Sequence, residues 1–412
     1  MKLRFALATL TAPWLALPAL ILLVVQAVSL QTFMTGELLL TADSAGIFVA
    51  LVGPVLAGLA AFDSSRTAGA TWGGVFSATG ARRRQSTWLV AWSTAPVTIA
   101  LWLATAARTA IALSEHGEGG ALGSVALTML LHGVALAFFA GLGITVGRAT
   151  PPIAAGALGL GLGYLATVLG AGARGERFGA LDLGGATVSR LGLNLDLTFL
   201  GMQLLVLAGL VITAVLLPGL GAPDPSRRRR SAGIWGIVTA ALLIMPVPGL
   251  PTSRWELAPE PPTSCTGSSP RVCTYPEHAR QAALVSDRLS AYAEGLRTAG
   301  FEALVPGAVE EYSRSYNPSG EEGVRGVDLS TYDDGPEARR NLVFDLVTPV
   351  HCPQLEAPVP PPDAYFDTVD RLAATVAQAV EPDIVATIWD PRPLSPDEAR
   401  AAIAALWSCS FS

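Results

Sequence analysis

Few side chains in this 412-residue sequence have the types and spacing that catalysis requires. Lys2 is the single lysine, so neither a nucleotide-binding loop of the G-x-x-x-x-G-K-[ST] type nor a catalytic lysine further along the chain is possible. The motifs H-E-x-x-H and G-x-S-x-G are absent, and His278 and His351 have no nucleophile or metal ligand at a recognisable spacing. We expect no ATP hydrolysis, no cofactor and no enzymatic activity, although a hidden pair of acidic side chains would leave no motif.

The four cysteines all lie in the last third of the chain, at Cys265, Cys273, Cys352 and Cys409. Such a distribution is typical of a region that folds in an oxidising compartment. We favour a Cys265–Cys273 disulfide that closes a short loop and a Cys352–Cys409 disulfide that ties down the C-terminus, while the other two pairings remain open. The close C-x2-C pair of a structural zinc site is missing, so we expect no metal.

Two polar side chains, His132 and Gln203, interrupt long apolar stretches. A polar group at membrane depth is costly and is therefore a candidate for function. An interhelical hydrogen bond is the simpler explanation, and we favour it.

Composition divides the chain into two regions. Hydrophobic residues make up 51% and charged residues 15% of the sequence, which excludes a purely soluble or disordered protein. The net charge of −6 argues against nucleic-acid binding. Residues 1–250 carry 15 basic and 9 acidic side chains, whereas residues 251–412 carry 12 and 24. We therefore predict a membrane domain over 1–250 and an extracytoplasmic domain over 251–412.

Seven apolar stretches precede residue 251, and each is long enough to cross a bilayer core, which takes about 20 helical residues. They are 14–33, 44–61, 87–107, 122–146, 153–171, 197–217 and 233–250. Arginines concentrate in alternate loops, so the N-terminus is expected in the cytoplasm, and an odd number of spans places the C-terminal region outside. The predicted fold is mostly α: a multi-pass membrane domain of about seven helices plus a small disulfide-bonded α/β or α+β domain.

The C-terminal region mixes helix and strand signals. Thr274 with Glu277 has capping-box spacing and predicts a helix over 276–299, which Gly300 ends. Ser395 with Glu398 predicts a second capped helix toward the C-terminus. An apolar stripe at helical spacing predicts another helix, at Phe366, Val369, Ala373, Val376 and Val380. Short apolar runs at 342–347 and 384–389 predict buried strands.

The second apolar stretch and the loop after it form a recognisable pattern. Asp63 and Arg66 follow the stretch, then a Gly/Ser/Thr-rich segment, then Arg82, Arg83 and Arg84 directly before the third stretch. This pattern resembles the permease subunits of ABC-2-type exporters in actinobacteria, over about residues 1–220. The resemblance implies a six-helix half-transporter, acting as a homodimer or with a sibling permease, whose loop contacts a separate ABC ATPase through these five residues. The arginines alone would also satisfy the positive-inside rule.

The same family often folds short re-entrant helices between its fifth and sixth spans, and residues 172–196 resemble such a lid. The seventh span and the extracytoplasmic domain depart from the family. We therefore expect a cell-membrane export subunit partnered in trans with an ATPase. The alternative is a non-transporting sensor, binding or self-protection protein that acts through its exterior domain.

Overall fold

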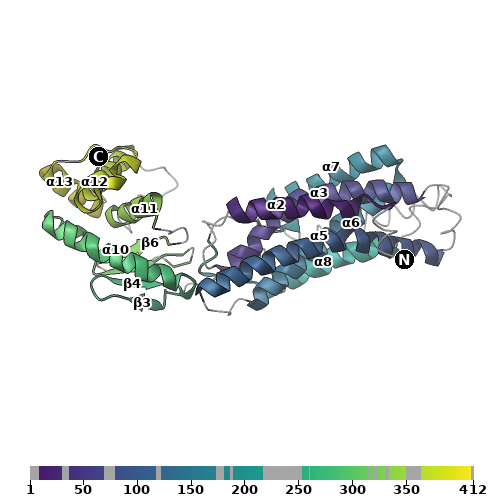
Figure 1. The fold of residues 1–412 in the computed structure, drawn as a ribbon, viewed down its shortest axis with the longest axis horizontal. Helices are drawn as coiled ribbons and strands as arrows, with labels where there is room; N and C mark the ends of the chain where they lie inside the picture. Colours follow the sequence, from purple (N-terminus) through teal and green to yellow (C-terminus); the bar gives the residue numbers. More distant parts are fainter. Residues whose placement is uncertain are drawn as a thin grey trace.

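The computed structural model describes residues 9–29, 37–68, 79–116, 122–172, 181–185, 189–216, 253–258, 260–313, 315–316, 318, 323–329, 334–348 and 363–409. Over these residues the chain is mostly helical. A bundle of long apolar helices lies beside a smaller domain of helices and strands, and the two follow one another along the long axis (Figure 1).

In the described part of the chain, six helices form the bundle. They are α2 (Ala16–Ser29), α3 (Leu38–Ala68), α5 (Thr79–His116), α6 (Leu122–Ala149), α7 (Pro152–Gly172) and α8 (Leu197–Leu216). All except α2 are long and apolar enough to cross a membrane. In the stretch predicted at 14–33, the described residues form α2 and the end of the 3-10 turn η1 (Ala12–Leu15). Residues 30–33 and the stretch predicted at 233–250 lie outside the described residues.

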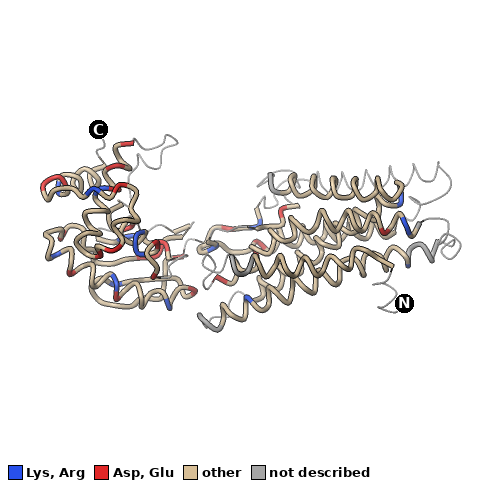
Figure 2. Tube along the Cα trace, turned by 45° about the horizontal axis from the view of Figure 1, so that its top comes forward, with Lys and Arg blue, Asp and Glu red and all other residues tan. Residues whose placement is uncertain are grey.

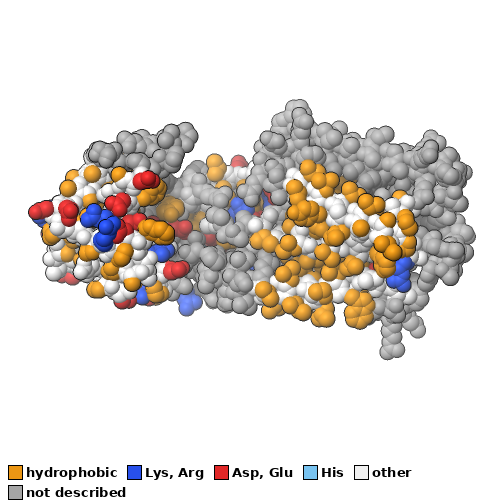
Figure 3. Space-filling model, turned by 90° about the horizontal axis from the view of Figure 1, so that it is seen from above, with side chains coloured by type: hydrophobic (Ala, Val, Ile, Leu, Met, Phe, Trp, Pro, Cys, Tyr) orange, Lys and Arg blue, Asp and Glu red, His pale blue; other side chains and the backbone are white. Residues whose placement is uncertain are grey.

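The bundle exposes apolar side chains, which cover much of the face seen in Figure 3. Leu103 is 66% exposed, Leu205 is 76% exposed and Ile153 is 88% exposed. Charged residues are sparse within the bundle and frequent in the smaller domain (Figure 2). This distribution suits an apolar solvent around the helices and water around the smaller domain.

Helix α3 packs closely against α6 and α7. A Cβ atom added to Gly143 of α6 would lie 2.1 Å from the carbonyl oxygen of Ala57, so only glycine permits this approach. Gly159 and Gly163 of α7, a G-x-x-x-G pair in the sequence, also lie against α3. We call the end of the bundle where α3 begins and α5 stops the outer end, and the opposite end the inner end.

The C-terminal domain is built on a four-stranded mixed sheet in the order β3-β4-β5-β6. Strand β4 is antiparallel to β3 and parallel to β5, which is parallel to β6. The strands are β3 (Ser264–Thr266), β4 (Arg271–Thr274), β5 (Ala308–Glu311) and β6 (Val324–Val327), and the helices are α10 (Ala279–Thr298), α11 (Pro336–Val347), α12 (Asp363–Val380) and α13 (Pro396–Trp407). Together they enclose one apolar core that includes Val272, Leu289 and Leu372.

The sequence predictions for this domain are confirmed for some elements and wrong for others. The Ser395–Glu398 capping box is present at the start of α13. The helix predicted over 276–299 is confirmed as the 3-10 turn η5 (Pro276–His278) followed by α10, but Thr274 does not cap it, because its hydroxyl donates to Ser264 instead. The capping-box prediction at Thr274 is therefore wrong.

The two predicted strands are also wrong. Residues 342–347 form the second half of α11, where alternate pairs of apolar residues face the core. Residues 384–389 belong mostly to the 3-10 helix η7 (Pro382–Thr387), and Trp389 is 91% exposed. Short apolar runs do not distinguish a buried strand from one face of a helix.

A two-stranded ribbon joins the bundle to the C-terminal domain. Strand β1 (Leu193–Leu195) directly precedes α8 and pairs antiparallel with β2 (Trp255–Leu257), which directly precedes the C-terminal domain. The segment 172–196, expected to resemble a lid, therefore has a strand near its end, whereas residues 173–180 and 186–188 lie outside the described part of the structure.

Candidate functional site

The outer end of the bundle contains a buried cluster of charged side chains. Asp43 lies near the start of α3 and is fully buried. Its Oδ2 atom is 2.6 Å from Nη2 of Arg190, and its Oδ1 atom is 3.0 Å from Nη2 of Arg254. Arg254 is 1% exposed, and both guanidinium groups also contact the ring of Trp255. One buried carboxylate thus pairs with two buried cations, and the Asp182 carboxylate lies 3.7 Å from Nη2 of Arg254 as a second counter-charge. A buried cluster of this kind is costly to break.

Residues 181–185 fold onto this cluster. Gly185 N donates to the Asp43 carbonyl oxygen over 2.9 Å, and Gly184 adopts a positive φ of 83° beside the Asp43 carboxylate. A Cβ atom on Gly184 would lie 2.2 Å from Asp43 Oδ1, so this position requires glycine for both its backbone and its space.

His132 and Gln203 hold the same segment. His132 Nε2 lies 3.0 Å from the carbonyl oxygen of Leu183, and Gln203 Nε2 donates to the carbonyl oxygen of Asp182. Both side chains are buried. These two side chains pair with backbone carbonyl groups of a loop inside an apolar bundle. Without them, the buried carbonyl groups would lack a hydrogen-bond donor, which is unfavourable. We expected hydrogen bonds between helices for these two residues, but the described bonds run from a helix to a loop.

A second buried cluster links the bundle to the C-terminal domain. His278 Nδ1 lies 2.5 Å from Glu311 Oε1 in β5, and its Nε2 atom lies 3.9 Å from Glu37 Oε1, just before α3. Burial lowers the pKa of His278, but attraction to Glu311, Glu37 and Glu277 outweighs it and raises that pKa to about 9. Burial also raises the pKa of Glu37. The imidazolium therefore bridges carboxylates from both domains.

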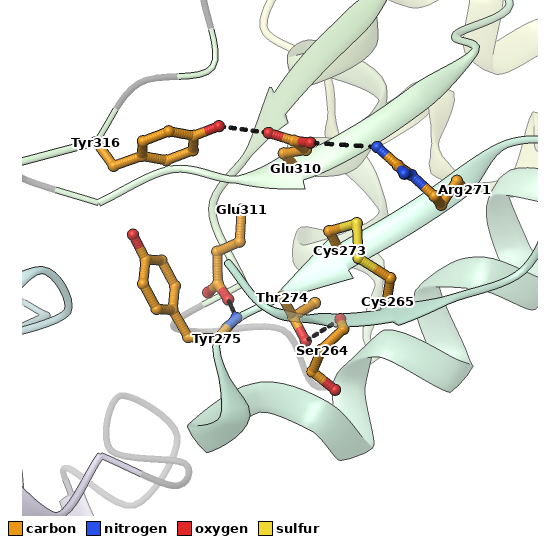
Figure 4. The surroundings of a disulfide bond; sticks show 9 residues. All are labelled: Ser264, Cys265, Arg271, Cys273, Thr274, Tyr275, Glu310, Glu311 and Tyr316. Carbon is orange, nitrogen blue, oxygen red and sulfur yellow. Dashed lines mark hydrogen bonds and ion pairs between the residues drawn. A yellow bond between two sulfur atoms is a disulfide. The ribbon is translucent and has the colours of Figure 1, made fainter. Parts of the chain in front are cut away.

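Tyr275 and Glu311 brace this link from the C-terminal domain. Tyr275 N donates to Glu311 Oε2 over 3.0 Å, at the end of β4, close to the disulfide between Cys265 and Cys273 (Figure 4). The disulfide joins β3 to β4, as we favoured from the sequence. Cys409 is also disulfide-bonded, whereas Cys352 lies outside the described residues.

A cavity of about 380 Å³ lies between the outer end and the C-terminal domain. We call it the junction cavity. Its walls come from the start of α3, from Ala112 of α5 and Ser124 of α6, from residues 190–195 and from the segments around residues 258–263 and 275–277. Its charged lining residues are Glu37, Arg190, Glu260 and Glu277. Among the residues that the structure describes, no three metal-binding side chains cluster.

The inner end holds the residues expected to contact an ATPase. Asp63 is buried and accepts hydrogen bonds from the backbone N–H groups of Thr11 and Ala12, so its carboxylate is engaged within the chain. Arg66 and Arg84 are exposed. The side chains of Arg82 and Arg83 are outside the described part of the structure.

Sequence reasoning missed the buried charges of the outer end. A second span over 44–61 leaves Asp43 in a loop, whereas α3 begins at Leu38. The available signal was the presence of acidic residues, Glu37 and Asp43, beside a long apolar stretch, since charges there need partners. No protein-family model, curated protein or solved structure matches the chain.

Proposed function

We propose that the chain is a permease-like membrane subunit of an ABC-2-type export system, partnered in trans with an ATPase. It crosses the cell membrane with its inner end in the cytoplasm and its C-terminal domain outside. Two copies, or one copy and a sibling permease, complete the transporter. The absence of a nucleotide-binding lysine makes a separate ATPase necessary.

The observation that carries this proposal is the order of elements along the bundle. Long apolar helices alternate in direction. Residues 181–185, between α7 and α8, lie on the outer end, where Asp43, His132 and Gln203 hold them. A polar segment buried at one end of an apolar bundle is tolerated where it is enclosed by protein or lines a pathway. This arrangement fits a gate at the outer side of a transport route.

Charge distribution supports the proposed orientation. Arg66, Arg84 and Arg148 lie toward the inner end, and a disulfide-bonded domain follows the outer end. The 20 residues of α8 cover about 30 Å. Helix α8 starts beside β1, and β2 pairs with β1, so the described chain stops at the inner end at Leu216 and resumes at the outer end at Ser253. We assign the seventh crossing to the apolar stretch 233–250 between these two points in the sequence.

The test is affinity purification of the tagged protein from its native host in mild detergent, followed by mass spectrometry. We expect a stoichiometric P-loop ATPase. The double variant Arg66→Ser/Arg84→Ser should lose it, because exposed cations are the described groups available for contact at the inner end.

Arg271→Ser/Arg400→Ser is the matched control, since it removes two exposed arginines from the C-terminal domain. It should retain the ATPase. Recovery of the intact wild-type protein without an ATPase, under conditions that preserve a known ABC complex, would overturn the proposal. The junction cavity would then favour the alternative, a ligand-binding protein that acts through its exterior domain.

A further inference from the structure

The contact between the bundle and the C-terminal domain contains a buried histidine between two carboxylates. The Nδ1 atom of His278 lies 2.5 Å from Oε1 of Glu311, and its Nε2 atom lies 3.9 Å from Oε1 of Glu37. Glu311 ends β5 of the C-terminal domain, whereas Glu37 directly precedes α3 of the bundle. All three side chains are buried. One titratable ring therefore joins acidic groups of two domains.

Each carboxylate also has a hydrogen-bond donor on its own side of the junction. Glu37 Oε2 accepts from the backbone N–H group of Arg190 over 2.6 Å, and Glu311 Oε2 accepts from that of Tyr275 over 3.0 Å. Neither bond involves His278, so each carboxylate keeps a partner when the two domains separate. The contact at His278 thus has the two arrangements that a switch requires.

Acidic groups surround His278 while the domains are in contact. Glu311 and Glu37 face it from β5 and from the bundle, and Glu277 lies in the same turn, η5. Tyr275, at the end of β4, directs its hydroxyl to a backbone carbonyl oxygen instead. Burial lowers the pKa of His278, but attraction to the three carboxylates outweighs burial and raises that pKa to about 9.

Helices α10 and α5 also pack against η5. In the first turn of α10, Arg280 is exposed to solvent. In α5, Arg108 contacts a serine of α3, and the side chains of Glu115 and His116 lie outside the described part of the structure. Among the described side chains, the acidic groups therefore set the charge state of His278.

A second set of contacts between the domains has no titratable group. Strands β1 and β2 pair through their backbones, and Ser315 Oγ lies 2.6 Å from the carbonyl oxygen of Gly192 and 2.8 Å from that of Ala258. These bonds persist when His278 loses its proton. The junction cavity is lined by β1 and by Pro276 and Glu277 beside His278, so it lies between the two sets of contacts.

We propose that His278 is a proton-operated latch between the bundle and the C-terminal domain. With its proton, the imidazolium holds Glu37 and Glu311 together. Without it, two buried carboxylates face each other with no cation between them, and the C-terminal domain pivots on the β1–β2 ribbon away from the outer end. This motion opens the junction cavity to the exterior solution. The latch is independent of any ATPase and goes beyond the export function proposed above.

The experiment measures the distance between the two domains at a series of pH values, in the full-length protein in mild detergent. Spin labels on Leu122→Cys, at the start of α6, and Thr298→Cys, at the end of α10, occupy exposed positions. Helix α10 extends from the junction away from the bundle, so its far end amplifies a tilt (Figure 1). Pulsed electron paramagnetic resonance should give one distance at pH 6.5 and a longer one in most molecules at pH 10, with half conversion near pH 9.

Glu37→Gln removes the carboxylate of the bundle and should abolish the conversion, because His278 then joins no pair of carboxylates from different domains. Glu302→Gln, which removes an exposed carboxylate of the C-terminal domain, is the matched control and should convert like the wild type. A label pair within that domain, Thr298→Cys with Arg400→Cys, should keep its distance at every pH.

Three results would overturn the proposal. They are an unchanged distance between the domains from pH 6.5 to pH 10 in the wild type, conversion of Glu37→Gln at the same pH as the wild type, and a simultaneous change in the label pair within the C-terminal domain. If Glu37→Gln does not fold, His278→Gln supplies the same test, because glutamine has no proton to lose in this range.

Discussion

Asp43 and Asp63 lie near opposite ends of the same helix, α3, and both are buried, yet their partners differ. Asp43 forms ion pairs with two guanidinium groups, from Arg190 and Arg254. Asp63 accepts hydrogen bonds from backbone amides at the start of η1. The outer end is therefore held by charge pairs that reach toward another domain, whereas the inner end is held by local amides and leaves its arginines exposed.

This difference indicates which groups at each end are fixed within the chain and which are available to a partner. Charge pairs at the outer end fix the position of segment 181–185 and of Arg254, which precedes the C-terminal domain. At the inner end the carboxylate anchors the chain before α2 and makes no described ion pair, so Arg66 and Arg84 remain available to a partner.

The largest effect is expected for Asp43→Asn. The variant removes the ion-pair partner of Arg190 and the nearer of the two carboxylates beside Arg254, which costs about 3–5 kcal/mol of unfolding free energy. Chemical unfolding in mild detergent measures it. Asp182→Asn is the control at the same end: this carboxylate is 29% exposed and 3.7 Å from Arg254, so we expect a loss of at most about 1 kcal/mol. Similar losses for the two variants would contradict the role of Asp43.

The second largest effect on stability is expected for His278→Gln. The pKa of His278 is raised from 6.5 to about 9, so the link to Glu311 and Glu37 contributes fully below pH 6.5 and is lost as the pH rises through 9. The contribution is roughly 3 kcal/mol. Unfolding measured between pH 6 and pH 10 should show this loss in the wild type and a flatter profile in the variant, and equally steep profiles would count against the link.

Asp63→Asn should lower the free energy of unfolding by less, about 1–2 kcal/mol. An asparagine oxygen in the place of Oδ2 still accepts from both backbone N–H groups, while its amide faces the Thr11 N–H group that Oδ1 also accepts in the wild type, and no charge is left unpaired. Hydrogen exchange at Thr11 and Ala12 should accelerate in the variant. A loss as large as that of Asp43→Asn would remove the distinction between the two ends.

The smallest effect on stability is expected for Arg66→Ser/Arg84→Ser. Both side chains are exposed, and the described contact of Arg66 is a cation–π contact with Phe62, so we expect a change within about 1 kcal/mol. Thermal unfolding in detergent checks this. A larger loss would mean that the loss of an ATPase from this variant reflects misfolding rather than a lost contact.

Local signals in the sequence predicted much of the fold. Apolar length located α3, α5, α6, α7 and α8, and the Ser395–Glu398 pair located the start of α13, because each signal depends on neighbouring residues. The strand prediction at 342–347 was wrong because a single short apolar run fits either a strand or one face of a helix. The residue that marks the start of this helix, Pro336, precedes the run and was not considered with it.

The buried charge clusters could not be predicted in the same way. His278 contacts residues far away in the chain on both sides, at Glu37 and Glu311, and no spacing rule connects such positions. His132 and Gln203 were identifiable as unusual within apolar stretches, but their partners in segment 181–185 depend on the three-dimensional fold. Burial could be predicted, whereas the choice of partner could not.

The β1–β2 ribbon has a mechanical consequence. Its first strand continues into α8 through Asp196, and its second strand leads directly into the C-terminal domain. The hydrogen bond from Asp196 N to the Arg254 carbonyl oxygen adds a cross-link at the junction. A tilt of α8 would therefore also move β1, and the pairing of β1 with β2 would carry this motion to the start of the C-terminal domain.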